Sequence, residues 1–227
     1  MTISVIIPTL NEAPAIEQTL LRLQHPAFLE ILVVDGGSQD GTLSLAANVS
    51  PRVRLLSAPR GRARQMNTGA AASTGDILLF LHADTLLPPT AGDDMVMALQ
   101  NPNILGGRFD VRLDTDTGWM WIVSRLMNLR SRLTRIATGD QALFVRKTVF
   151  HALGGFPDIP IMEDIAFSRQ LKHEGRIAAI DRCVITSARR WRRHGAVRTI
   201  MLMWWLRLLY FAGVSPWRLK QWYPETR

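Results

Sequence analysis

The sequence predicts an α/β fold, in which a mostly parallel sheet is flanked by helices and followed by a helical C-terminal tail. Apolar, β-branched runs alternate with helical patterns through about the first hundred residues, and a polar turn follows each run. This alternation is typical of parallel strands that are joined by right-handed crossovers. The hydrophobic content of 47% is sufficient for a sizeable core in a chain of 227 residues.

The elements of the first half follow from this pattern in order. Each expected strand is a short apolar run, and each expected helix has apolar residues at helical spacing, with Asp40 as a candidate N-cap. Strands are expected at residues 3–7, 31–34, 53–56 and 77–81, and helices at residues 13–24, 40–48 and 62–73.

The second half is less regular but contains runs of the same kinds. Strands are expected at residues 105–113, 142–145, 177–180 and 184–186, and helices at residues 119–133 and 163–173. The tail opens with RRWRRHG and continues with AVRTIMLMWWLRLLYFAG, which has a helical pattern and is nearly apolar on all sides.

Acidic side chains follow the ends of three expected strands. The buried run in DILLFLHADT leads directly into His82 and Asp84, Asp35 ends the second strand, and Glu12 follows the first. A carboxylate at the end of a buried strand is costly to desolvate unless a metal ion, a ligand or an arginine compensates its charge. Since ligands of such sheets bind at the carboxyl ends of the strands, we expect these acids to line one crevice.

The net charge of +8 originates in the C-terminal tail. Residues 189–227 contain nine Lys or Arg residues and one acid, whereas the rest of the chain contains 18 residues of each sign. Such a tail indicates an anionic partner, which could be a lipid surface, phosphate or nucleic acid.

The remaining composition indicates the compartment. The single cysteine, Cys183, excludes an internal disulfide and suits a reducing cytoplasm. The first residues contain no basic region and their apolar run ends at Pro8, so we expect neither a signal peptide nor a spanning helix there.

Four segments, SVIIPTLNE, ILVVDGGSQDGT, NTGAAASTGDILLFLHADT and GGFPDIPIMEDIAFSRQL, together resemble the family 2 glycosyltransferases of the GT-A fold. The resemblance extends over residues 3–171, and the tail is similar to that of a small bacterial subgroup whose acceptors are unassigned. It implies a Rossmann-like, mostly parallel sheet in a catalytic domain at residues 1–188, followed by the tail at residues 189–227. Residues 1–100 would form the nucleotide-binding half of that domain and residues 101–188 the acceptor half.

The resemblance also implies which residues bind the nucleotide sugar, which is expected to be a UDP-sugar. These residues are Pro8, Thr9, Asn11, Glu12, Asp35, Gly37, Arg62, Arg64, Asn67, His82 and Ala83.

Two positions depart from the family pattern. The triplet 82–84 replaces the Asp-x-Asp metal motif and keeps its second acid only, and Gly36 stands where many relatives have a second Asp. Asp84 is therefore the expected ligand of Mg²⁺ or Mn²⁺, and His194 is a second candidate beside the metal and the phosphates.

Sugar transfer requires that the leaving diphosphate is stabilised and that the acceptor hydroxyl loses a proton. A divalent cation bound by one or two carboxylates and by phosphate oxygens meets the first requirement. By the resemblance, the pair Glu163 and Asp164 contains the base, at a helix start that favours a carboxylate. Asp164 is the preferred base and Asp140 the second candidate. Attack from the side opposite the leaving group would invert the anomeric configuration.

Plainer interpretations stay open for several of these residues. Residues 163–164 could be ordinary acids of a helix start, and Arg62 and Arg64 could be solvated surface residues. His82 could be a packing residue, and the pair Trp204–Trp205 could belong to the core and not to a lipid-facing surface.

The apolar run at residues 200–214 is interrupted by Arg207 and is shorter than the roughly 20 residues that span a bilayer. It is compatible with a helix that lies in an anionic membrane interface. We therefore expect a cytoplasmic protein that is peripheral on the inner face of the membrane, close to a lipid-linked or amphiphilic acceptor. Alternatively, the tail closes over the active site or forms the surface of a homodimer.

Two other protein classes share single features with this sequence. A nucleotidyltransferase could use a similar sheet and metal, but no Gly-rich, Lys-bearing phosphate loop follows the first strand. A nucleic-acid-binding protein would account for the basic tail but not for the acids at the strand ends, which repel phosphate. No nucleic-acid partner is therefore expected.

Overall fold

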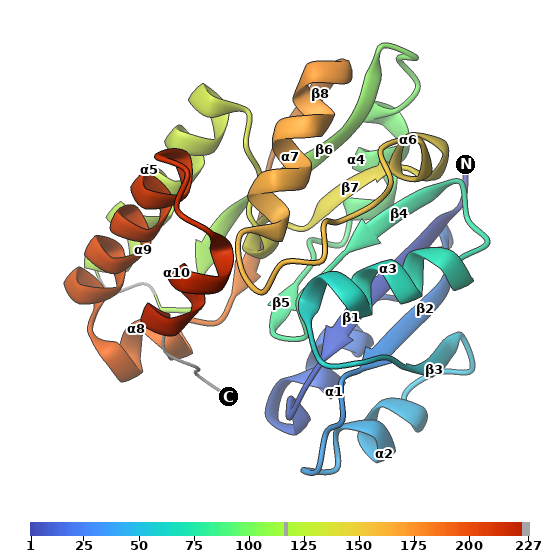
Figure 1. Cartoon of the computed structure of the whole chain (residues 1–227). Helices are drawn as coiled ribbons and strands as arrows, with labels where there is room; N and C mark the ends of the chain where they lie inside the picture. Colours follow the sequence, from blue (N-terminus) through green and yellow to red (C-terminus); the bar gives the residue numbers. More distant parts are fainter. Residues whose placement is uncertain (116–117, 224–227) are drawn as a thin grey trace.

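The computed structural model describes residues 1–115 and 118–223 of the chain. Over these residues the strands form one sheet of eight strands in the order β3-β2-β1-β4-β7-β6-β8-β5 (Figure 1). The predicted α/β fold is confirmed. The sheet is mixed, because β7 runs antiparallel to both β4 and β6, and β5 runs antiparallel to β8.

The first half of the chain builds four neighbouring parallel strands of the sheet, as predicted. Its strands are β1 (Ile3–Thr9), β2 (Phe28–Asp35), β3 (Val53–Ser57) and β4 (Ile77–Phe80). Thr9 lies opposite Asp35 in the register of β1 and β2, and Leu81 continues β4 by donating its N–H to the carbonyl of Ile6. The segments that follow β1, β2 and β4 therefore leave the sheet at the same edge.

The helices cover both faces of the sheet because alternate strand residues are apolar on both sides. They are α1 (Ala13–Leu21), α2 (Thr42–Ala47), α3 (Arg62–Ala72), α4 (Ala91–Ala98), α6 (Lys147–Ala152) and α7 (Glu163–Glu174). Val5 and Ile7 of β1 pack in a core with α1, α2 and α4, whereas Ile6 packs in a second core with α3, α6 and α7. Of these helices, α4 and α6 were not predicted.

The other strands of the sheet are β5 (Thr85–Leu86), which was not predicted, β6 (Ile104–Leu113), β7 (Leu143–Arg146) and β8 (Arg176–Thr186). The two short strands expected at residues 177–180 and 184–186 are one strand, β8, so that expectation is corrected. The polar residues between them stay extended, because β8 continues to pair with β6 through a register shift at Phe109 and Asp110.

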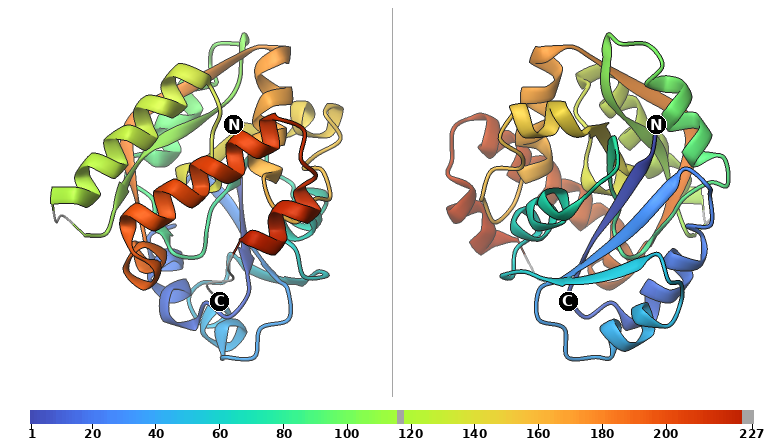
Figure 2. Two further views of the ribbon diagram at one scale, coloured as in Figure 1. Left: turned by 60° about the vertical axis from the view of Figure 1, so that its left-hand side comes forward. Right: turned by 90° about the vertical axis from the view of Figure 1, so that its right-hand side faces the viewer.

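Four helices form a separate group outside the sheet. They are α5 (Gly118–Thr134), α8 (Arg189–His194), α9 (Ala196–Phe211) and α10 (Pro216–Trp222), of which α8 and α10 were not predicted as separate helices. α5 and α9 run alongside each other in the left view of Figure 2, and Ile200 of α9 packs with Val123 of α5. Leu206 of α9 and Leu219 of α10 pack against Ile161 and Ile165 at the start of α7, so the tail is attached to the rest of the protein.

Within the described residues, none of the helices is both long enough and apolar enough to cross a bilayer.

Candidate active site

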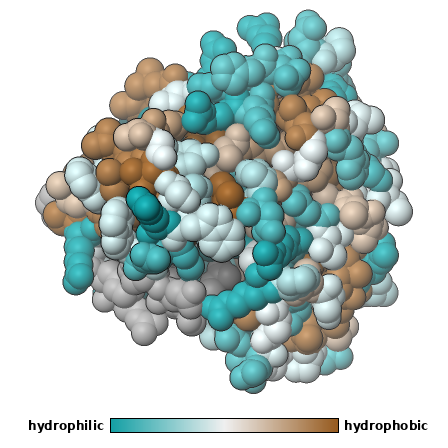
Figure 3. Space-filling view, viewed as in Figure 1, coloured by the Kyte–Doolittle hydropathy of each residue, from teal (hydrophilic) through white to brown (hydrophobic). Residues whose placement is uncertain are grey.

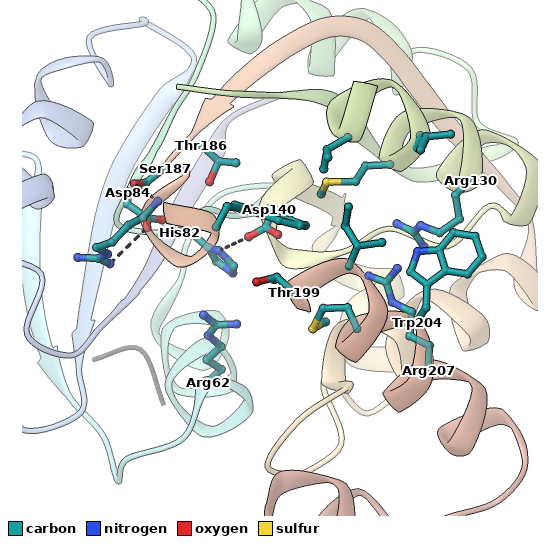
Figure 4. A pocket seen from close by; sticks show the side chains of 17 residues that line it. Arg62, His82, Asp84, Arg130, Asp140, Thr186, Ser187, Thr199, Trp204 and Arg207 are labelled. Atoms are coloured by element: carbon teal, nitrogen blue, oxygen red, sulfur yellow. Dashed lines mark hydrogen bonds and ion pairs between the residues drawn. The ribbon is translucent and has the colours of Figure 1, made fainter. Parts of the chain in front are cut away.

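Two adjoining cavities lie where β4 ends and share the side chains of Arg62, His82, Asp140, Met203 and Arg207. The first, of about 140 Å³, lies between α5, α9 and the end of β8 (Figure 4). The second, of about 430 Å³, is enclosed by the start of α3, the loop before α7, and α10. The shared residues make the two cavities parts of one site.

The segment that follows β4 contributes His82 to this site. The Nδ1 atom of His82 lies 3.1 Å from Oδ1 of Asp140, and His82 is nearly buried. Gly139 packs so closely on the ring that a Cβ atom at this position would lie 2.3 Å from Nε2 of His82. The His82–Asp140 contact therefore depends on a residue without a side chain at position 139.

Ala83 and Asp84 point in different directions from this segment. Ala83 lies in the core, and its carbonyl accepts a hydrogen bond from the Thr19 hydroxyl at 2.7 Å, so its side chain lines neither cavity. Asp84 lines the first cavity, and its carbonyl accepts the Ser187 N–H.

Arg189 compensates the charge at the end of the buried strand. Its Nη2 atom lies 3.4 Å from Oδ2 of Asp84 and 3.0 Å from Oε2 of Glu12. Burial lowers the pKa of Arg189, but its interactions with Glu12 and Asp84 outweigh burial and raise the pKa above the ordinary value. Of the three possible compensating groups, the structure shows the arginine.

The donor set at Asp84 fits one mode of divalent-cation binding. Among the described residues, no three His, Cys, Asp or Glu side chains are grouped to hold a metal ion. Mg²⁺ is commonly bound by one or two carboxylates with substrate phosphates completing its shell. Asp84 suits this mode, because its 3.4 Å contact with Arg189 is longer than a normal charged hydrogen bond and leaves the carboxylate partly exposed.

Asp164 is held by two backbone donors at the start of α7. Its Oδ2 atom accepts the Gly139 N–H at 2.7 Å, and its Oδ1 atom accepts the Ile165 N–H at 2.7 Å. Asp164 lines the second cavity together with Asp140, which the Gly139 segment also positions. The two candidate bases are therefore brought to one site.

Glu163, beside Asp164, lies in a different electrostatic environment. Its side chain is buried at the wall of the second cavity. Burial, followed by the charge of Asp164, raises the pKa of Glu163 to about 7, and the charge of Arg62 opposes this shift. Neighbouring carboxyl groups whose environments differ in this way are common in active sites.

The residues of α3 have three different environments. Arg62 lines both cavities. Arg64, at the rim of the second cavity, donates from Nε to both oxygens of Asp158, at 2.9 Å and 3.1 Å. The amide of Asn67 is engaged by the backbone of Phe156, donating at 2.8 Å and accepting at 3.0 Å, so Asn67 fixes the loop before α7 and lines neither cavity.

The polar residues at the ends of β1 and β2 form a hydrogen-bonded turn. Neither cavity is lined by Thr9, Asn11, Glu12, Asp35 or Gly37, so of the three strand-end acids expected in one crevice only Asp84 lines a cavity. Asp35 accepts the N–H groups of Gly37 at 2.8 Å and Ser38 at 2.9 Å. Asn11 donates its N–H to the Ser38 hydroxyl at 2.8 Å, and the Thr9 hydroxyl lies 3.4 Å from Oδ1 of Asp35.

Of the remaining expected residues, Pro8 is buried in β1 opposite Val34. The side chain of His194 lies outside the described part of the chain, so its expected role is not placed here.

Three arginines of the site were not assigned to it from the sequence: Arg130 of α5, Arg207 of α9 and Arg189 of α8 all line the first cavity. A signal was present for Arg207, since it interrupts an otherwise apolar helix. Arg130 and Arg189 lie in segments that contain several arginines, and no pattern distinguishes them from their neighbours.

Residues 4–153 match the family model for Glycosyl transferase family 2. The probable glycosyltransferase YdaM of Bacillus subtilis is 28% identical over 190 residues, which cover 71% of this chain and 44% of that protein. A PGL/p-HBAD biosynthesis glycosyltransferase of Mycobacterium tuberculosis is 41% identical over 92 residues, which cover 37% of this chain and 36% of that protein. The chain thus spans less than half the length of these relatives.

Solved structures of glycosyltransferases have the same fold. The mannosyltransferase PcManGT from Pyrobaculum calidifontis, in complex with GDP-Man and Mn²⁺, is 26% identical, with a TM-score of 0.66 over 84% of this chain and 59% of that chain. TarS from S. aureus, residues 1–349 in complex with UDP, has a TM-score of 0.68 at 20% identity, over 82% of this chain and 60% of that chain. These similarities confirm the GT-A fold expected from the sequence.

Proposed function

Because this chain belongs to glycosyl transferase family 2, we propose that it transfers a sugar from a UDP-sugar to a hydroxyl acceptor. One observation carries the proposal: Asp84 and Arg189 line the same site as the His82–Asp140 pair, and Asp164 joins that pair in the adjoining cavity. A metal-binding candidate with a neighbouring arginine therefore lies on one side of the site, and the candidate bases lie on another. The similarity to a mannosyltransferase that binds GDP-Man supports a nucleoside diphosphate sugar as donor.

The donor diphosphate is proposed to lie beside Asp84. Arg62 and Arg189 both line the first cavity, so the chain offers cationic groups to the diphosphate there. Asp84 would hold Mg²⁺ or Mn²⁺ together with the phosphates, and the bound cation supplies electrostatic stabilisation of the leaving diphosphate. The nucleoside would extend from this point towards the turn that contains Asp35 and Asn11, at the ends of the parallel strands.

Asp164 is the proposed general base. Its two backbone N–H partners fix the orientation of the carboxylate, which lies at the N-terminus of a helix of 12 residues. A base must accept the proton of the acceptor hydroxyl within hydrogen-bonding distance during attack on the anomeric carbon. With the diphosphate at Asp84 and the base on another wall, attack from the opposite side would invert the configuration.

We propose that the acceptor is amphiphilic and that α5 and α9 contact a membrane surface. Brown, hydrophobic side chains gather on the side of the molecule that these helices occupy (Figure 3). The exposed apolar residues of the two helices are Trp121, Ile122, Leu126, Leu129, Leu133, Val197, Met201, Trp204, Trp205, Leu208 and Phe211. Trp204 and Trp205 thus do not belong to the core, and their exposure supports a lipid-facing surface. This arrangement suits a protein that is peripheral on the inner face of the membrane.

Calorimetric titration with UDP and with GDP, each in the presence and absence of Mn²⁺, tests the donor. We expect UDP to bind more tightly with Mn²⁺, and Asp84→Asn to lose this enhancement but to retain the fold. Tighter binding of GDP than of UDP would show that the donor contains guanine in place of the expected uracil. If neither nucleotide binds under any of these conditions, the proposed activity is wrong.

A flotation assay with vesicles that contain anionic lipid tests the membrane contact. The full chain is compared with the double variant Trp204→Ser and Trp205→Ser, and sedimentation measures the oligomeric state of both proteins. We expect the wild type to float with the vesicles and the variant to stay at the bottom. Equal distribution of the two proteins, or a wild-type dimer that the variant converts to monomer, would contradict the proposal.

A further inference from the structure

Two arginines with unpaired donors meet in the first cavity. Figure 4 shows the guanidinium groups of Arg130, from α5, and Arg207, from α9, on the same side of the cavity beside Trp204. The Nε and Nη2 atoms of Arg130 and the Nε atom of Arg207 are buried and have no hydrogen-bond partner among the described residues. Buried donors of charged groups are costly to leave unpaired, so their presence requires an explanation.

The nearby carboxylates act on this pair through space and not through direct contact. Asp140 and Asp164 act on both guanidinium groups through their charges, but neither forms an ion pair with them among the described residues. Burial lowers the pKa of both arginines, and the charge of Arg207 contributes to lowering that of Arg130 to about 10. Arginine stays protonated in proteins at neutral pH, so the cavity contains two adjacent positive charges. No ion pair to either guanidinium is found among the described residues.

The walls around the two arginines are apolar. α5 contributes Val123, Leu126 and Met127, and α9 contributes Ile200, Met203 and Trp204. Leu126 and Trp204 also belong to the exposed apolar surface of these helices. The cavity thus extends from the arginine pair to the exposed apolar surface of α5 and α9. This arrangement suits a molecule that has an anionic group attached to an apolar chain.

The position of the pair favours the acceptor over the donor. Asp84 and Arg189, where the diphosphate is proposed to lie, are on the other side of Asp140 from Arg130 and Arg207 (Figure 4). In Figure 4 the arginine pair is therefore separated from Asp84, on the donor side of the site, by Asp140. A ligand group held there would belong to the second substrate.

We infer that Arg130 and Arg207 bind an oxyanion of the acceptor, a phosphate or a carboxylate attached to an apolar chain that lies between α5 and α9. This inference rests on the proposed function, because it assigns the substrate class of the same site. Two guanidinium groups offer parallel N–H donors in the geometry that phosphate and carboxylate oxygens accept.

Calorimetric titration of the full chain with octyl phosphate, octanoate and octanol tests the inference. Octyl phosphate or octanoate is expected to bind and octanol is not, and Arg130→Gln and Arg207→Gln are each expected to weaken the anion at least about tenfold, the effect of losing a charged hydrogen bond. Arg125→Gln and Arg198→Gln are matched controls, since both arginines are on the same two helices and exposed, and neither lines the cavity. Circular dichroism verifies that each variant is folded.

A second arm distinguishes the source of the anion. Vesicles of phosphatidylcholine with and without dodecyl phosphate are floated with the wild type and with the double variant Arg130→Gln and Arg207→Gln. Recruitment by dodecyl phosphate that the double variant lacks supports a membrane-resident acceptor, whereas binding of the soluble amphiphile alone supports a soluble one.

Titration of the same double variant with UDP separates this inference from the proposed function. Normal UDP binding with weakened anion binding supports the inference. Loss of UDP binding with unchanged binding of octyl phosphate would assign the pair to the donor and overturn it. Equal affinity of wild type and double variant for every amphiphile, or the absence of anion binding in both arms, would also overturn it.

Discussion

The Nη2 atom of Arg189 lies 3.4 Å from Oδ2 of Asp84, although 105 residues separate the two along the chain. The same atom lies 3.0 Å from Oε2 of Glu12, whose side chain is fully buried. One guanidinium therefore compensates two carboxylates that follow different strands. It also attaches the first residue of α8 to the edge of the sheet.

Replacing Arg189 by Gln should destabilise the protein, because the buried carboxylate of Glu12 loses a charged partner. Since Arg189 is partly exposed and solvent screens its charge, we expect a loss of about 1–2 kcal/mol in the free energy of unfolding. Urea denaturation measures this loss. Arg192→Gln is the matched control, because Arg192 is in the same helix and contacts Asp114 at 3.2 Å in an exposed pair. A loss of equal size in both variants would contradict the prediction.

Local pattern predicted most of the fold because most strands are short apolar runs between polar turns. β1 to β4 are such runs, and their predicted positions agree with the structure. The pattern failed where tertiary pairing overrides composition. Asp181 and Cys183 interrupt the apolar sequence of β8, yet the strand continues because β6 supplies its backbone partners. Short helices such as α10 were missed because seven residues contain too few turns for a clear period.

The sequence predicted those residues of the candidate site whose positions follow from the sheet topology. Strand-end position predicted that Asp84 faces a crevice, and it lines the first cavity. The partner of Asp84 could not be predicted, because no local pattern distinguishes Arg189 from the other arginines of RRWRRHG. Asn67 is a different case: the family resemblance implied contact with the nucleotide sugar, but in the structure the backbone of Phe156 engages both ends of its amide.

Gly139→Ala adds one methyl group, which should disrupt the contact between His82 and Asp140. The added Cβ atom would lie 2.3 Å from Nε2 and 2.7 Å from Cε1 of His82, so either the ring or the segment with Asp140 must move. We expect a destabilisation of about 1–3 kcal/mol by thermal or urea unfolding, with a reduced rate of donor hydrolysis. Gly118→Ala is the control, because no atom of the described residues is found within 4 Å of the position of its Cβ atom. Full activity of Gly139→Ala would show that the His82–Asp140 contact is not required.

Asp164→Asn tests the base assignment. The amide oxygen can still accept the Gly139 N–H, although the amide NH2 group cannot accept the Ile165 N–H. The Gly139 segment should therefore keep its position while the proton acceptor is lost. We expect kcat for sugar transfer, or for slow donor hydrolysis, to fall by about 100- to 10,000-fold with unchanged UDP binding. Asp140→Asn is measured beside it and should have the smaller effect. If Asp140→Asn is the more damaged variant, the roles of the two residues must be exchanged.

Glu163→Gln should stabilise the protein at alkaline pH and have little effect in acid. Burial and the charge of Asp164 raise the pKa of Glu163 from 4.5 to about 7 in the folded state. Below pH 4.5 the group is protonated in both states. As the pH rises from 4.5 to 7, the unfolded chain releases the proton first, so the free energy of unfolding falls, by about 3 kcal/mol in total. Glutamine cannot ionise, so the variant should escape this loss.

The melting temperatures of wild type and variant should therefore agree near pH 4.5, diverge up to pH 7 and then differ by a constant amount. Glu17→Gln, an exposed control on α1, should follow the wild type throughout. A difference in melting temperature that does not change with pH would show that Glu163 is ionised in the folded protein.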